Sequence, residues 1–137
     1  MLLAYLGFSF YDVATLSLVR QQDAQEFHAI QVDRISPDDS PSIREGGAAA
    51  TLKGIEFNMF GAFFSRAYRE NDYLWGRLHG AERMIDIVAS TLPGEDMIPN
   101  AELTELKHTL FRAILAEERD RLTSIPELLA TLETELG

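Results

Sequence analysis

Three stretches of the chain repeat apolar residues every three or four positions, the spacing that places side chains on one face of an α-helix. The first stretch covers residues 2–19 and contains Leu3, Leu6, Phe10, Val13 and Leu16. The second covers residues 72–88 and contains Leu74, Leu78, Ala81, Ile85 and Val88. The third begins at Asn100, ends near Leu122 and contains Leu103, Leu106, Leu110, Ile114 and Leu115. These patterns predict three amphipathic helices with buried apolar faces.

The segments between these helices predict shorter elements. From Phe27 to Ile35, apolar and polar residues alternate, which indicates a short half-buried strand. Ser36 precedes Pro37 and two acids, which predicts a brief helical turn because Ser caps helices and Pro fits their first position. Residues 40–50 contain proline and two glycines and predict a loop, whereas residues 52–63 favour a helix over a strand.

Polar residues mark where the predicted helices begin. Asn71 or Asp72 is placed to cap the second helix, and Asn100 is placed to cap the third. The run Ser124-Ile-Pro126-Glu127 has the form of a capping box and predicts a final helix that ends at Leu136.

Length and charge narrow the class of protein. A chain of 137 residues with 46% apolar residues suits one globular domain, which we expect over residues 1–137. Its fold is predicted to be mainly α, α+β at most, with four to five helices and one short strand or hairpin. Residues 93–137 hold ten acids and four bases, −6 of the net charge of −10, and predict an acidic helical hairpin. This charge argues against a nucleic-acid partner, because phosphate binding depends on Lys and Arg.

The apolar N-terminus raises the question of a membrane segment. No Lys or Arg precedes the run that starts at Met1, Asp12 lies inside it, and no run reaches the roughly 18 apolar residues of a spanning helix. We expect a buried helix there, no transmembrane segment and a cytoplasmic protein, with a peripheral membrane location as the alternative. The absence of cysteine excludes a disulfide, a thiol nucleophile and a thiolate metal site.

A dense polar cluster lies at the start of the second predicted helix. Its members are Arg69, Asn71, Asp72, Trp75, Arg77, His79 and Glu82. One interpretation is a binding site, since carboxylate and imidazole groups on one helix face can hold a ligand or metal. The favoured interpretation is a structural network in which Arg69 or Arg77 pairs with Asp72 and Trp75 donates its indole N–H to a carbonyl.

The sequence lacks the motifs of a serine hydrolase. The closest approach to a Gly-x-Ser-x-Gly elbow is Gly7-Phe-Ser9-Phe10-Tyr11, in which the second glycine is absent and bulky rings would crowd the turn. Ser9 is therefore predicted to be structural. No Gly-rich phosphate loop is present either.

Several short motifs nevertheless suggest a family. In chain order they are Phe10-Tyr11-Asp12-Val13, Arg34-Ile35-Ser36-Pro37, Leu52-Lys53-Gly54, Phe60-Gly61-Ala62-Phe63 and Arg69-Glu70-Asn71-Asp72-Tyr73-Leu74-Trp75-Gly76-Arg77-Leu78. Over residues 8–92 this order resembles the C-terminal region of bacterial patatin-like proteins, a domain of unknown function. The last run is the most specific, because Asn, Asp, Trp, Gly and Arg rarely coincide at fixed spacing.

The resemblance implies a role beside an enzyme of lipid metabolism. The catalytic domain of such proteins hydrolyses lipid acyl esters with a Ser–Asp dyad, the serine in Gly-x-Ser-x-Gly and the aspartate in Asp-Gly-Gly or Asp-Gly-Ala. Neither motif occurs in this chain. We therefore expect no catalytic residue, cofactor or metal here, and an accessory region that packs against or caps a patatin-like catalytic domain in the same or another chain. Many relatives carry Asp at the position of His79, so no carboxylate role transfers to that residue.

Two other hypotheses remain open. The chain could be a helical interaction module that forms a homo-oligomer through Leu103, Leu106, Leu110 and Ile114. Alternatively, it could be a small metal-binding protein that uses Asp72, His79 and Glu82.

Overall fold

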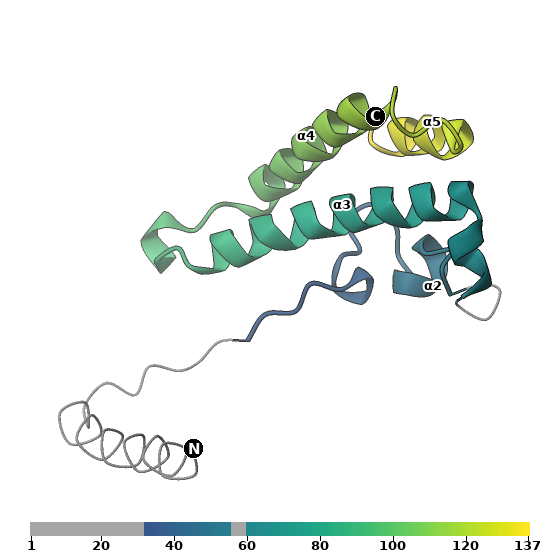
Figure 1. Cartoon of the computed structure of the whole chain (residues 1–137). Coiled ribbons are helices and arrows are strands. Elements are labelled where there is room, and N and C mark those ends of the chain that lie inside the picture. The colour runs from purple at the N-terminus through teal and green to yellow at the C-terminus, as the bar shows by residue number, and fades with distance from the viewer. Residues whose placement is uncertain (1–31, 56–59) are drawn as a thin grey trace, which may run out of the picture. The chain divides into compact units, whose positions relative to one another are not determined.

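The computed structural model describes residues 32–55 and 60–137, of which Asp33–Gly137 form a compact unit (Figure 1). Its α-helices are α2 (Gly47–Thr51), α3 (Arg66–Ser90), α4 (Asn100–Glu118) and α5 (Pro126–Glu135). Its 3-10 helices are η1 (Pro37–Asp39), η2 (Gly61–Phe64) and η3 (Gly94–Asp96). The described residues contain no strand, so the prediction of a mainly α fold is confirmed. The predicted helix over residues 2–19 lies outside the described residues.

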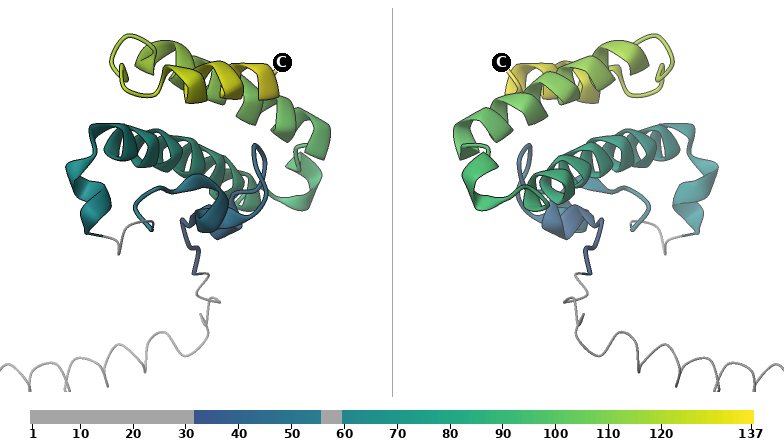
Figure 2. Two further views of the ribbon diagram at one scale, coloured as in Figure 1. Left: turned by 90° about the vertical axis from the view of Figure 1, so that its right-hand side faces the viewer. Right: turned by 90° about the vertical axis from the view of Figure 1, so that its left-hand side faces the viewer.

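Helix α3 is the central element of the unit. Figures 1 and 2 show it between the α4–α5 pair on one side and the segment from residue 33 to 55 on the other. It begins at Arg66, because the hydroxyl of Ser65 accepts a hydrogen bond from the backbone N–H of Tyr68 at 3.3 Å. The predicted caps Asn71 and Asp72 are wrong, since both lie within the helix.

The apolar stripes of α3 and α4 meet in one core. Its buried members are Leu74, Trp75, Leu78, Phe111, Ile114, Leu115, Leu122, Ile125, Leu129, Leu132 and Leu136. Ile43 and Leu52 pack against this core from the segment before α3. Residues that are distant in the sequence therefore share one apolar interior, which is what fixes α4 and α5 against α3.

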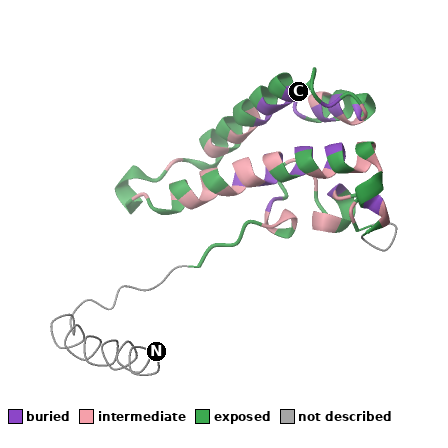
Figure 3. Cartoon of the chain, viewed as in Figure 1, coloured by how far each residue is buried: buried purple, intermediate pink, exposed green. Residues whose placement is uncertain are grey.

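Only part of each stripe is buried (Figure 3). The buried residues of α3 lie between Glu70 and Glu82, and those of α4 lie between Phe111 and Glu118. Val88 and Leu106 were predicted to be buried but are 60% and 48% exposed. A stripe gives a helix an apolar face, but no described element covers this end of the two helices.

The segment before α3 differs from the prediction in several places. Residues 32–36 form no strand, and the rest of that predicted strand lies outside the described residues. The predicted turn is confirmed, because the Ser36 hydroxyl accepts a hydrogen bond from the N–H of Asp38 at 3.3 Å. The loop predicted over residues 40–50 contains the start of α2, and residues 52–55 form a turn where a helix was favoured.

Side chains from elsewhere explain these differences. Gly46 takes a left-handed φ of 101°, and the carboxylate of Asp38 accepts the N–H of Ala48 at 3.1 Å, which starts α2. The capping box at Ser124 is also wrong: Ile125 precedes α5, and the N–H of Ser124 donates to Glu70 at 2.7 Å. Pro126 occupies the first position of α5, which suits a residue without an N–H.

Asn100 does not cap α4. It is the first residue of that helix, and Pro99 takes the cap position with no side-chain hydrogen bond. The helix and its approximate start were therefore predicted correctly, but its cap was not.

Candidate functional site

The Asn71–Asp72 pair holds the turn that follows α2. The two carboxylate oxygens of Asp72 accept the backbone N–H groups of Lys53 at 2.6 Å and Gly54 at 2.7 Å. The side-chain amide of Asn71 donates to the carbonyl of Thr51 at 2.8 Å. A Cβ on Gly54 would lie 2.5 Å from a carboxylate oxygen of Asp72, so any larger residue here would require that carboxylate to move. The sequence motif Leu52-Lys53-Gly54 therefore contacts the motif that begins at Arg69.

The prediction that Asp72 pairs with Arg69 or Arg77 is therefore wrong. Arg69 instead donates to the backbone carbonyl of Phe63, and its guanidinium lies 5.6 Å from the centre of the Phe63 ring. This contact ties η2 to the first turns of α3. Trp75 makes no indole hydrogen bond to another described residue, so that part of the predicted network is not found.

Arg77 pairs with a carboxylate that the sequence reasoning missed. One oxygen of the fully buried Glu118 accepts hydrogen bonds from Arg77, from the Tyr73 hydroxyl at 2.9 Å and from Arg121 at 3.0 Å. The second guanidinium nitrogen of Arg77 reaches Glu117 at 2.9 Å. The cluster joins α3 to the C-terminal end of α4.

The environment of Glu118 favours its charged form. Burial would raise the pKa of this carboxyl, but the hydrogen bonds from Arg77 and Tyr73 and the charge of Arg121 outweigh burial and hold the pKa below its usual value. Glu118 continues the apolar stripe of α4 beyond Leu115, so an acid at a core position was the signal that could have revealed it.

Glu70 makes a similar connection to the C-terminal helix. Its carboxylate accepts a hydrogen bond from the guanidinium of Arg66 at 2.7 Å and another from the backbone N–H of Ser124 at 2.7 Å. Burial would raise the pKa of Glu70, but the hydrogen bonds from Ser124 and Arg66 lower it on balance. Glu70 thus fixes the loop before α5 onto α3.

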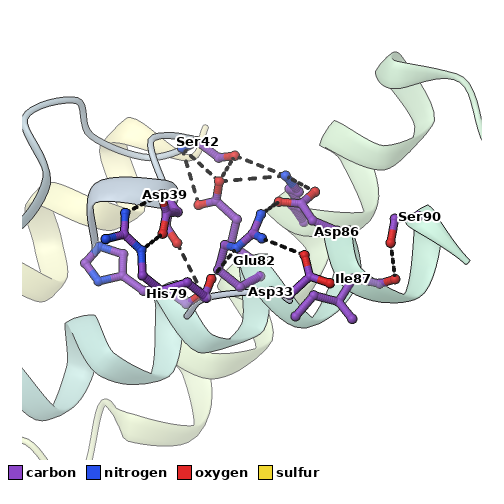
Figure 4. A network of polar contacts seen from close by, with 12 residues as sticks. Asp33, Asp39, Ser42, His79, Glu82, Asp86, Ile87 and Ser90 are labelled. Atoms are coloured by element: carbon purple, nitrogen blue, oxygen red, sulfur yellow. Dashed lines mark hydrogen bonds and ion pairs between the residues drawn. The ribbon is translucent and has the colours of Figure 1, made fainter. Parts of the chain in front are cut away.

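Glu82 binds the loop that precedes α2, as Figure 4 shows. Its carboxylate accepts the Ser42 hydroxyl at 2.6 Å and the Ser42 backbone N–H at 3.3 Å. The ammonium of Lys107 on α4 lies 3.7 Å from Glu82 and 2.7 Å from Asp86. One buried carboxylate on α3 therefore meets both the preceding loop and α4.

Trp75 and His79 form an interior stack. Their ring centres are 5.2 Å apart, and the guanidinium of Arg44 lies 5.1 Å from the Trp75 ring. His79 is 4% exposed, and neither ring nitrogen has a hydrogen-bond partner in the part of the chain that the structure describes. Burial lowers the pKa of His79, which favours the neutral ring. Its role here is that of a packed aromatic ring.

The cluster predicted from the sequence thus divides into separate contacts. Asp72, His79 and Glu82 contact different partners, and the described residues contain no group of three metal-binding side chains. The polar atoms of the run face other parts of the domain. Their arrangement supports cohesion between segments and offers no converging pair of acid and base.

A separate surface feature is an apolar groove at the end where α3 is joined to α4. We call it the hairpin groove, and it has a volume of about 260 Å³. It is lined by Met84, Ile85, Val88, Ala89, Leu92, Ile98, Leu103 and Leu106. The partly buried stripes of the two helices therefore leave a wholly apolar depression on the surface.

The sequence matches the model of a family described as a protein of unknown function, DUF3376, over residues 2–136. The chain belongs to the DUF3376 family. The match includes residues 93–136, which carry none of the short motifs on which the patatin-like resemblance rests. The finer resemblance to patatin-like proteins stays a prediction.

One curated protein is similar to part of this chain. The chain is 28% identical over 86 residues to a Mycobacterium tuberculosis protein named as an uncharacterized membrane protein. The matched stretch is 61% of this chain but 8% of that relative. No solved structure matches the chain.

Among the described helices, none has both the length and the hydropathy to cross a bilayer.

Proposed function

We propose that this DUF3376 domain is a non-catalytic accessory domain that packs against or caps the catalytic domain of a patatin-like lipid acyl hydrolase. The observation that carries the proposal is that the polar side chains of α3 contact other segments of the domain. Asp72, Arg77 and Glu82 each bind another segment of the same domain. Such side chains stabilise a scaffold, and a scaffold with an open apolar groove is suited to docking.

Two further observations support a role within a larger assembly. The matched stretch makes up a small fraction of the mycobacterial relative, so in that protein the domain accompanies a much longer polypeptide. The chain also lacks both halves of the Ser–Asp dyad. A cytoplasmic location belongs to the same proposal.

The first test is the activity of the chain alone. We expect no hydrolysis of a short-chain p-nitrophenyl ester above the blank, because the described polar groups offer no activated nucleophile. Ester hydrolysis that disappears after Ser9→Ala would contradict the proposal directly.

The second test is association. The chain is produced together with a patatin-like catalytic region that contains Gly-x-Ser-x-Gly and Asp-Gly-Gly. We expect a complex on size exclusion and a higher melting temperature of the catalytic region, because binding to the folded state stabilises it. An unrelated serine hydrolase of similar size is the control. Two separate peaks with unchanged melting temperatures would reject the docking role.

Self-association is the second candidate, because Leu106 and Leu110 are partly exposed on α4. Ile114, the fourth residue of the predicted face, is buried in the core of the domain and is not free for a partner. Light scattering separates the two candidates, since a stable dimer supports self-association and a monomer opposes it.

A further inference from the structure

The hairpin groove brings together exposed apolar side chains of α3 and α4. Met84 is 55% exposed, Val88 60% and Leu106 48%, and all three line the groove. Monomeric proteins seldom leave several large apolar side chains open at one place unless a partner covers them. The lining residues of α3 run from Met84 to Ala89, five positions or about 7.5 Å along the helix.

The charges beside the groove are acidic. Glu95 and Asp96 lie in η3, between the lining residues Leu92 and Ile98, and Glu102 lies one turn before Leu106. Over residues 32–55 and 60–137, none of these three carboxylates makes a hydrogen bond or an ion pair. These three residues are called the acidic rim.

The nearby bases do not neutralise the acidic rim. Lys107 is directed to Asp86 and Glu82, and Arg112 binds Glu105 at 2.7 Å. The groove therefore presents an apolar floor beside uncompensated negative charge.

This charge decides between possible occupants. A second copy that bound through the same surface would form a two-fold interface and place two acidic rims in one interface, which is unfavourable. An anionic lipid surface would be repelled for the same reason. A helix with an apolar stripe and flanking Lys or Arg residues fits both the floor and the rim.

We propose that the hairpin groove is the docking site for an amphipathic basic helix of a partner protein. Two or three apolar side chains at i, i+3 or i+4, and i+7 of that helix contact Val88 and Leu106, and its Lys or Arg residues pair with the acidic rim. The inference rests on the proposed docking role and adds the surface and the chemistry of the partner.

The experiment titrates the isotope-labelled chain with a synthetic helical peptide of Leu and Lys, followed by NMR. A matched peptide of Leu and Glu with the same apolar stripe is the control for charge. We expect the Leu–Lys peptide to shift the signals of Met84, Val88 and Leu106, and the Leu–Glu peptide to bind at least tenfold more weakly.

Two variants of the chain test the apolar floor of the groove and the acidic rim separately. Val88→Ser with Leu106→Ser is expected to weaken binding of the Leu–Lys peptide at least tenfold while circular dichroism stays unchanged, because both side chains are already exposed. Glu95→Gln with Asp96→Asn and Glu102→Gln is expected to weaken binding and reduce its dependence on salt. Ala116→Ser, at another exposed position of α4, is the matched control for the floor variant.

Several results would overturn the inference. These are signal shifts spread over the acidic surface, equal affinity for the two peptides, unchanged affinity of the floor variant, or a groove already filled by a second copy or by residues 1–31. Association with the catalytic region is measured separately with the same floor variant. If that complex persists while the peptide fails to bind, the docking role stands and the groove is not its site.

Discussion

Replacement of Glu118 by Gln tests whether the buried carboxylate holds α4 to α3. The substitution keeps the shape of the side chain and removes the charge that binds Arg77, Arg121 and the Tyr73 hydroxyl. Removal of one partner from a buried ion pair costs about 3–5 kcal/mol. Arg77 keeps Glu117 as a partner, so we expect the free energy of unfolding at pH 7 to fall by about 2–3 kcal/mol.

The pH dependence gives a second, independent readout. The pKa of Glu118 is lower in the folded protein than in the unfolded chain. Its contribution to stability is therefore complete above the unfolded pKa, about 4.3, and is lost as the pH falls through the folded pKa. The difference in stability between wild type and Glu118→Gln should be largest at pH 7 and should shrink below about pH 4.

Urea unfolding followed by circular dichroism measures both effects. Glu117→Gln is the matched control, because Glu117 is the adjacent residue, binds the same arginine and is 59% exposed at its side chain. We expect this control to lose less than about 1 kcal/mol. The reasoning is refuted if the two variants lose the same stability, or if the effect of Glu118→Gln is constant between pH 7 and pH 3.

Three further changes test other contacts. Gly54→Ala should cost about 1–3 kcal/mol by pressing on the carboxylate of Asp72, and the cost should vanish in an Asp72→Ala background, as a double-mutant cycle by urea unfolding would show. His79→Phe should stabilise the domain by about 1 kcal/mol at pH 7, because it removes two buried unpaired nitrogens. Since the folded pKa of His79 is lowered, the stability advantage of His79→Phe over wild type should grow below about pH 6.5 in unfolding measured across pH. Phe111→Ala should lower the free energy of unfolding by about 3–5 kcal/mol, and a loss below 1 kcal/mol would contradict its place in the core.

The family-level conclusions depend on different tests. Association with a catalytic region tests the accessory role, and the peptide titration tests the hairpin groove. Neither depends on the stability predictions, because the variants used for the groove replace exposed side chains.

The sequence by itself determined the presence of the helices at α3, α4 and α5 and the turn at Pro37. Leu74 and Leu78 are buried as predicted, Pro37 begins a helical turn as predicted, and a final helix is present although Ser124 does not cap it. These features depend on local physics: the helical period selects a face, and Pro37 has no N–H to lose at the first position of its turn.

Only the tertiary structure decided which partners the polar residues have. An Asp is equally suited to cap its own helix or to bind a distant turn, and Asp72 binds the turn at Gly54 because Ser65 already starts α3. Glu118 is charged and buried because residues from α3 meet it there. Val88 continues an apolar stripe yet stays exposed, since burial requires a covering element and periodicity alone supplies only a face.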